Sequence, residues 1–294
     1  MKKNLKSILI LVTLCIYLAL CFFHSDLVRE NFLEYSLLLL TKLFPVSFIM
    51  FLFSSLLIRY QLLEVCSSLL SIHTHKFYVF LLSSLSGFPS GAKCVKELFE
   101  QKSISLEEAN HILMFSHFPN PLFVLGSVSS LVRSPKLCIG ILCSIGISNF
   151  ILMIGKPSKK EKVLEKEISF PNNFSHVLTE SIFSSMHTLI IIYGVSMFFY
   201  LFSSMITKHI SLSTPFFILW NGCFDLTKGI FSTSLIQNSL HRAYWILGFL
   251  SFGSLSIHMQ VKSILAETPV SYWSFLKGRI IGTILSFFLF SFLH

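Results

Sequence analysis

The chain has 294 residues, of which 53% are apolar and only 13% are charged, about half the charged share of an average soluble domain. A soluble domain of this size could not hide so much apolar surface beneath a charged exterior. The composition therefore excludes an ordinary globular enzyme, a disordered chain and a fibrous protein, and it predicts an integral membrane protein in contact with the lipid bilayer. The net charge of +9 indicates loops at an anionic cytoplasmic surface, not a nucleic-acid partner.

The first segment predicts a transmembrane helix that starts in the cytoplasm. Lys2, Lys3 and Lys6 precede the apolar run Ile8–Phe23, and no signal-peptidase site of the A-x-A type follows it. Because lysines beside a span stay on the cytoplasmic side, the N-terminus is expected there. Residues 1–34 are expected to form this helix and an external loop.

Four further apolar stretches approach the ~20 residues that a helix needs to cross ~30 Å of hydrocarbon. They are Tyr35–Ile58, Leu137–Ile154, Ile182–Ile206 and Trp273–Leu293. Four other apolar segments are interrupted by glycine, proline or polar residues. They are Phe77–Phe99, broken at Ser86–Gly91; His111–Val132, broken at Phe118–Pro121; Pro215–Leu240, broken near Asn221 and Gly222; and Ala243–Leu265, broken at Gly253–Ser256.

Basic residues set the expected orientation. The segment Gly155–Phe170 is rich in lysine, and Lys262, Lys277 and Arg279 flank the start of the last span. Both regions are therefore expected in the cytoplasm. One arrangement satisfies these positions: in each half, the first interrupted segment is a re-entrant hairpin and the second is a broken span.

The two halves then share one order of elements, run in opposite directions: span, re-entrant hairpin, broken span, span. The predicted fold is an all-α polytopic membrane protein built from an inverted repeat, with an extra N-terminal helix. Its units are a first repeat at 35–154, a basic cytoplasmic linker at 155–175 and a second, inverted repeat at 176–294.

A sequence echo supports the repeat, because Gly87 precedes Lys93 at the same spacing as Gly222 precedes Lys228. Inverted halves with interrupted apolar segments at matching places are typical of secondary transporters. Unwound backbone cannot face lipid, since its N–H and C=O groups would be unpaired. The breaks are therefore expected to line a cavity near the middle of the membrane.

The breaks also resemble a known family. Four stretches carry the resemblance: Ser86–Lys93, Pro121–Val128, Asp225–Gly229 and Ser251–Val261. In this order they are similar to signatures of the YlbJ/SpoVV sporulation membrane proteins. What the resemblance implies is a Gate or nucleoside-recognition domain, related in architecture to concentrative nucleoside transporters. It also implies export of dipicolinic acid from the mother cell into the forespore, across the outer forespore membrane.

Two lysines at the breaks are candidates for contact with an anion. A lysine at membrane depth needs a carboxylate, carbonyl groups or a bound anion, so Lys93 either contacts the solute or extends to the cytoplasmic surface. Lys228 either contacts the solute or pairs with Asp225, one helical turn away. His117 and His258, in the broken spans, are able to shuttle protons or bind a carboxylate; the alternative is a satisfied polar residue in a helix bundle.

The other candidates for substrate binding are polar or glycine residues at the breaks, which suit a planar polar ring or act as helix caps. They are Ser86, Gly87, Ser90, Gly91, Asn120, Asp225, Thr227, Ser254, Ser256 and Gln260.

The sequence thus predicts a transporter of a small organic anion, with dipicolinate as the first candidate. The alternatives are a nucleoside or another small anion carried by the same fold, and a sporulation membrane scaffold that transports nothing. The sequence has no HExxH, GxSxG or Walker motif, so no enzyme activity, cofactor or metal is expected. Assembly into a homo-oligomer stays open.

Overall fold

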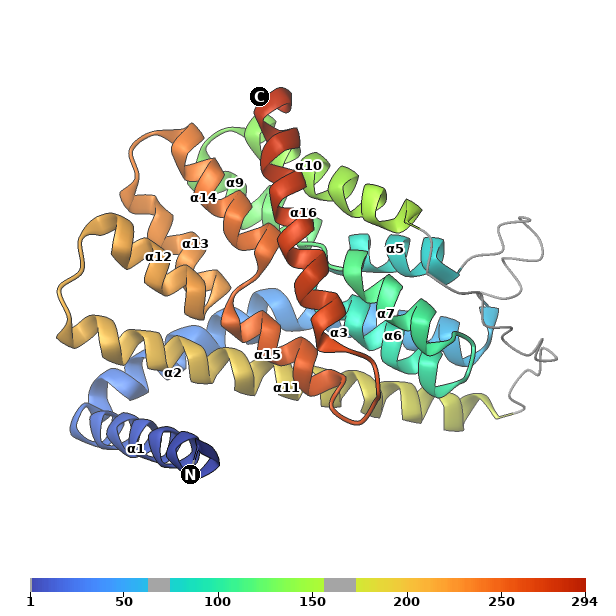
Figure 1. Ribbon diagram of the computed structural model, residues 1–294, viewed down its shortest axis with the longest axis horizontal. Helices are drawn as coiled ribbons and strands as arrows, with labels where there is room; N and C mark the ends of the chain where they lie inside the picture. The colour runs from blue at the N-terminus through green and yellow to red at the C-terminus, as the bar shows by residue number, and fades with distance from the viewer. Residues whose placement is uncertain (1, 63–74, 156–172) are drawn as a thin grey trace.

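The computed structural model describes residues 2–62, 75–155 and 173–294, and every regular element in these ranges is a helix (Figure 1). The basic linker predicted at 155–175 lies almost wholly outside the described residues. The six cysteines within the described ranges are free.

Three long helices of the described chain match predicted spans. α10 (Pro135–Ile154), α11 (Phe174–His209) and α16 (Tyr272–Leu293) are each long and apolar enough to cross a membrane. Ser134 and Asn173 begin α10 and α11 as N-caps, each accepting a hydrogen bond from the backbone amide three residues on. Together with the other apolar helices, these three confirm an all-α polytopic membrane fold.

The N-terminal region differs from expectation. α1 (Lys2–Phe23) is followed by α2 (Ser25–Leu38), so the external loop predicted before residue 35 is wrong. The two helices meet at a bend of 94° and provide a fourth candidate span if they are counted together. α2 is helical because it has a buried face: Tyr35 belongs to a buried cluster with Met197 of α11.

The predicted span Tyr35–Ile58 is not one regular helix. The chain passes from α2 through a π-helical turn, η1 (Leu39–Leu43), into α3 (Phe44–Arg59). Pro45 has no amide N–H to continue the regular ladder of hydrogen bonds, and a widened π turn before it absorbs this defect. α3 packs against α11.

All four predicted interruptions are present. In the first half they separate α5 (His75–Ser86) from α6 (Ser90–Glu100), and α7 (Leu106–Phe115) from the continuous run of α8 (Pro121–Phe123), η2 (Val124–Val128) and α9 (Ser129–Val132). In the second half they separate α12 (Thr214–Phe224) from α13 (Leu226–Ser232) with its short extension η3 (Thr233–Leu235), and α14 (Ser239–Phe252) from α15 (Leu255–Ile264).

One break lies later than predicted. Gly222 is inside α12, and the chain leaves the helix at Asp225. Gly229 of α13 packs directly on Gly222, since a Cβ on Gly229 would overlap the Gly222 Cα. Gly222 therefore serves a close approach of two helices. Asp225 ends α12 because its backbone is extended and its side chain caps α13.

The two predicted hairpins lie toward opposite ends of the long helix α11 (Figure 1). Figure 1 shows α5, α6 and α7 toward one end of α11, and α12, α13 and α14 toward the other. Lys96 of α6 donates a 3.1 Å hydrogen bond to Glu267 in the loop before α16, and this bond lowers the pKa of Glu267. The end of the first hairpin and the start of the last helix thus lie together, as the predicted orientation requires. The opposite orientation of the halves across the membrane stays a prediction.

Candidate functional site

A small cavity with polar and apolar walls lies where the interrupted segments of both halves meet, and we call it the central cavity. Six of the predicted site residues line it: Ser86, Asn120, Asp225, Thr227, Ser256 and Gln260. Tyr35 of α2 and Ser196 of α11 complete its polar wall. Its volume is about 70 Å³, which suffices for a few water molecules but lies below the ~300–1,000 Å³ of typical ligand pockets. The cavity as described is therefore smaller than a typical small-molecule site.

Asn120 joins the two breaks of the first half. Its side-chain amide donates to the Ser86 carbonyl oxygen at 3.3 Å, while its Oδ1 accepts from the Leu122 amide at 2.8 Å and caps α8. Gly87 has a φ of +79°, and a Cβ there would lie 2.7 Å from the backbone nitrogen of Asn120. Only glycine fits this position, for its conformation and for the close approach.

Asp225 joins the two breaks of the second half. Its Oδ2 accepts hydrogen bonds from the Tyr35 hydroxyl at 2.8 Å and from Ser256 at 3.4 Å, and its Oδ1 accepts from the Lys228 backbone amide at 2.9 Å. The side chain is buried. No described cation forms an ion pair with it, so hydrogen bonds alone satisfy the carboxylate.

Gln260 offers an unused hydrogen-bond acceptor to the central cavity. Its Nε2 donates to Ser196 Oγ at 2.8 Å, whereas its Oε1 has no partner among the described residues. The residue is 1% exposed. A buried polar atom without a partner costs several kcal/mol in an apolar medium, so a donor from a solute or from water would be stabilised there.

Lys93 does not contact the central cavity. Its ammonium is 2.7 Å from Glu97 Oε1, and its side chain is 3% exposed. Ser55 and Ser184 donate to the same Glu97 oxygen at 2.9 and 2.7 Å. The structure therefore shows Lys93 neither at the surface nor in the central cavity, because Glu97 neutralises its charge inside the protein.

Lys228 lies in a second polar cavity of about 400 Å³, which we call the Lys228 cavity. Its Nζ donates to Ser204 Oγ at 2.6 Å and lies 5.1 Å from the centre of the Tyr200 ring. The predicted ion pair with Asp225 does not form, because the Asp225 carboxylate caps the backbone of α13 and faces the central cavity.

Neither predicted histidine lines the central cavity. His117 is buried, contacts the Leu250 carbonyl oxygen at 3.2 Å and stacks on Phe88 with ring centres 4.8 Å apart. His258 is held between the Tyr272 hydroxyl at 2.8 Å and the Phe252 carbonyl at 3.1 Å. These contacts correspond to the alternative of satisfied polar residues in the bundle.

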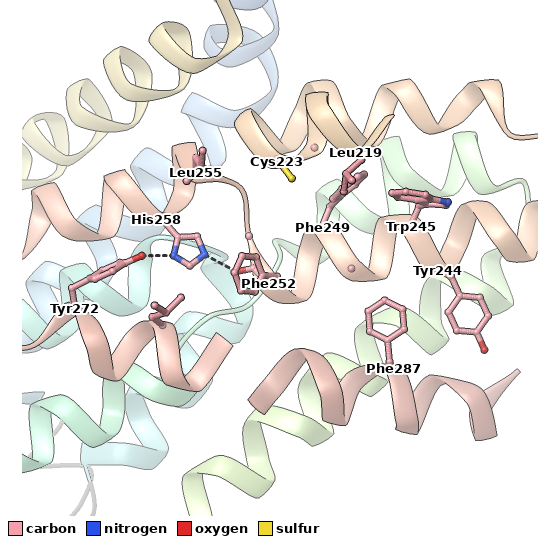
Figure 2. Close-up of a pocket in the computed structure, with 14 residues that line it drawn as sticks. Leu219, Cys223, Tyr244, Trp245, Phe249, Phe252, Leu255, His258, Tyr272 and Phe287 are labelled. Atoms are coloured by element: carbon pink, nitrogen blue, oxygen red, sulfur yellow. Dashed lines mark hydrogen bonds between the residues drawn. The ribbon is translucent and has the colours of Figure 1, made fainter. Parts of the chain in front are cut away.

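Figure 2 shows His258 at one end of a large apolar groove lined by α12, α14, α15 and α16. This lateral groove has a volume of about 690 Å³, and rings such as Trp245, Phe249 and Phe287 form its walls. Its lining suits hydrocarbon better than an ionised solute.

The remaining predicted residues shape the breaks. Ser90 donates to the Gly87 carbonyl oxygen. Gly91 packs against Ser116, where a Cβ would overlap the Ser116 carbonyl. Ser254 caps α15 and is 2.7 Å from Ser256.

Arg279 is an important residue that the sequence placed wrongly, at a cytoplasmic helix end. It is 1% exposed, and its guanidinium donates to the carbonyl oxygens of Ser251 and Met114 at 3.1 and 2.7 Å and to Asn149 Oδ1 at 3.1 Å. Ser251 precedes one break and Met114 another. Arg279 therefore ties the two broken segments to α10 and α16.

Sequence reasoning also missed Tyr35, Ser196 and Glu97. The spacing of Glu97 four residues after Lys93 was the available signal for the ion pair. No local pattern marks Tyr35 or Ser196, which reach the cavity from distant parts of the chain.

Long apolar helices around a small cavity with polar and apolar walls define an all-α, multi-pass integral membrane protein. The described residues contain no group of three or more His, Cys, Asp or Glu side chains placed to hold a metal ion.

Comparison with known proteins agrees with this class. The chain is 25% identical over 245 residues to the sporulation integral membrane protein YlbJ of Bacillus subtilis, an alignment that covers 69% of this chain and 60% of the relative's length. The chain is therefore similar to this sporulation membrane protein over about two thirds of its own length. No family model matches the chain, and no solved structure matches it.

Proposed function

We propose that this protein is a membrane transporter that acts in sporulation and carries a small organic anion, with dipicolinate as the first candidate. The observation that carries the proposal is the central cavity, where the breaks of both halves meet within one cavity. The similarity to a sporulation membrane protein supports the setting, and the resemblance at the breaks supports the solute and the outer forespore membrane as the location.

The cavity has the chemistry expected of a solute site in a membrane. Interrupted helices leave backbone groups that cannot face lipid, and here residues at the breaks line one cavity. Gln260 Oε1 has no partner among the described residues, and the same cavity is also lined by Ser196 and Ser256. A planar solute with donors and acceptors at its edge would satisfy these groups.

Transport through this cavity requires opening. A volume of about 70 Å³ is too small for an aromatic dicarboxylate, so the described conformation corresponds to an occluded state. In transporters with two repeated halves, movement of one unit against the other exposes a central site to each side in turn. Contacts such as Tyr35–Asp225 would open in one of these states.

A specific observation favours a second candidate solute. The charged side chain lining the central cavity is Asp225, an acid, and it would repel a dianion. An uncharged solute such as a nucleoside fits the electrostatics of the central cavity alone. An anion requires compensation, for which Lys228 in the adjacent cavity is the nearest described candidate.

Transport into vesicles separates the two solutes. Purified protein in proteoliposomes is expected to take up dipicolinate in a saturable manner, with little competition from uridine. Gln260→Met keeps the side-chain volume but removes the polar atoms, so we expect KM to rise by roughly tenfold. Gln237→Met, on an exposed turn, is the matched control. Uptake of uridine without dipicolinate would select the second candidate.

Deletion of the gene in the sporulating host tests the setting. Spores with low dipicolinate content are expected, and a strain without paralogues is required. Normal dipicolinate in such spores would contradict the proposal. Normal sporulation with transport-inactive but normally expressed variants would instead indicate the scaffold role.

A further inference from the structure

The Lys228 cavity is a candidate site for a carboxylate. Its lining combines Lys228 with the Tyr200 ring and with the hydroxyl-bearing side chains of Ser232 and Ser234. Lys228 is half-buried, whereas Ser234 is exposed, so the cavity reaches the protein surface while its cation lies deeper. Its volume of about 400 Å³ falls within the ~300–1,000 Å³ typical of small-molecule sites.

The Lys228 ammonium has no ion-pair partner among the described residues, although Asp225 and Glu34 lie close enough to interact with its charge. It has three donors, of which Ser204 Oγ takes one at 2.6 Å, and the ammonium also lies against the Tyr200 ring. No carboxylate in the described ranges forms an ion pair with it. Lys93 is the contrast within the same chain, since Glu97 neutralises it at 2.7 Å. A lysine held at depth without a carboxylate is well suited to bind one from a solute.

The Lys228 cavity adjoins the central cavity. Tyr35 and Thr227 line both cavities, so one layer of side chains separates them. Tyr35 is fixed in that wall by two contacts: its ring stacks on Tyr200 with centres 4.2 Å apart, and its hydroxyl donates to Asp225. Tyr35 and Thr227 together therefore form the wall between the two cavities.

We propose that the Lys228 cavity is the outer binding site of the transport route, where the ammonium of Lys228 holds a carboxylate of the organic anion before the solute passes Tyr35 into the central cavity. This inference rests on the proposed function. It places the carboxylate on the Lys228 ammonium and outside the central cavity, whose lining includes Asp225. Glu34, at the exposed rim of the same cavity, is the charge that opposes anion binding.

Direct binding measurements test the site independently of transport. The probe is dipicolinate, titrated calorimetrically against the full chain in nanodiscs, and pyridine-2,6-dimethanol is its uncharged analogue. We expect Lys228→Gln to weaken dipicolinate binding by roughly tenfold or more, because a charge-assisted hydrogen bond is lost. Lys228→Arg keeps the charge and should bind within a few-fold of the wild type. The analogue should be insensitive to both changes.

Lys208→Gln is the matched control. Lys208 lies on α11 one turn after Ser204 and is exposed, so the substitution removes an equal charge close to the cavity without changing its lining. Unchanged binding is expected. Equal losses of dipicolinate affinity in Lys208→Gln and Lys228→Gln would mean general electrostatic attraction and would overturn the site. A folded Lys228→Gln protein with wild-type affinity would also overturn it, as would a wild-type protein that does not bind dipicolinate.

The proposed function and the site fail in different ways. If wild-type proteoliposomes transport dipicolinate and binding is independent of Lys228, the site is wrong and the transporter stands. If binding depends on Lys228 but no dipicolinate crosses the membrane, the site stands and the transport proposal is wrong. Size-exclusion profiles of each variant show whether a loss of binding reflects loss of folding.

Discussion

The Tyr35 hydroxyl donates a 2.8 Å hydrogen bond to Asp225 Oδ2 across 190 residues of sequence. Tyr35 belongs to α2, before the first interrupted segment, and Asp225 stands at the break between α12 and α13. The bond thus lies in the wall between the central cavity and the Lys228 cavity, and it connects two parts of the chain that are distant in sequence. Breaking it removes one of three hydrogen bonds from a buried carboxylate.

Tyr35→Phe should therefore destabilise the described conformation. The ring can still stack on Tyr200, but Asp225 loses a donor, at a cost of about 1–3 kcal/mol for a charged buried partner. We expect a lower thermal unfolding temperature in detergent and a faster passive leak of dipicolinate from proteoliposomes. Tyr244→Phe, which removes a hydroxyl from the lateral groove, should change neither. A Tyr35→Phe protein as tight and as stable as the wild type would show that this bond does not hold the wall.

The buried pair of Lys93 and Glu97 should be a structural element. Removing one partner leaves an uncompensated charge, so Lys93→Met or Glu97→Gln should each destabilise the protein by about 3–5 kcal/mol. The double variant Lys93→Met with Glu97→Leu should recover much of this loss, since no charge is left buried. Thermal unfolding measures the stability. Dipicolinate uptake by a stable double variant is expected, and its loss would return Lys93 to the substrate site.

Two glycines at the breaks should differ in their tolerance of alanine. Gly253 has φ +90° and ψ 164°, a region nearly restricted to glycine, and Gly253→Ala should cost about 1–3 kcal/mol. Gly87→Ala adds an overlap with Asn120 to a positive φ, so it should cost more and reduce expression. Gly146 of α10, where a Cβ would meet only open space, is the control, and its replacement by Ala should be neutral or stabilising by up to about 1 kcal/mol. Equal effects at all three positions would contradict this ranking.

Arg279 should not be replaceable by lysine. Its guanidinium reaches acceptors on α7, α10 and α14 at once, and a single ammonium cannot reproduce that fork. We expect Arg279→Lys to lose on the order of 2 kcal/mol of stability, measured by unfolding in detergent. Lys277→Arg, on the exposed face of the same helix, controls for a general effect of exchanging the two residues. Full stability of Arg279→Lys would indicate that the charge alone suffices.

Glu34→Gln should tighten anion binding at the Lys228 cavity. Removing a negative charge from the exposed rim relieves repulsion in a well-hydrated setting, so a gain of roughly twofold to tenfold is expected. The effect should shrink as salt is raised through about 0.15 M, where the Debye length is near 8 Å. Calorimetric titration with dipicolinate at two ionic strengths measures both features. Weaker binding by this variant would show that Glu34 assists the site instead.

Local patterns in the sequence were sufficient to predict the helical architecture. Apolar runs of membrane length predicted α10, α11 and α16, and glycine or proline inside shorter runs predicted that four segments are interrupted. These are backbone effects that depend on neighbouring residues, because proline lacks a donor and glycine permits a positive φ. The break at Asp225 was displaced because Gly222 serves helix packing, and packing partners are invisible locally.

The sequence by itself therefore determined the class of protein, most of its helices and six residues of the central cavity. The tertiary structure alone decided which of the two lysines at the breaks has an ion-pair partner. Lys93 and Lys228 occupy similar local settings, yet Glu97 neutralises the first, while capping by Asp225 leaves the second without a carboxylate. The physical reason is that the state of a buried charge depends on the groups within a few ångströms in space, and those groups come from helices far apart in the chain.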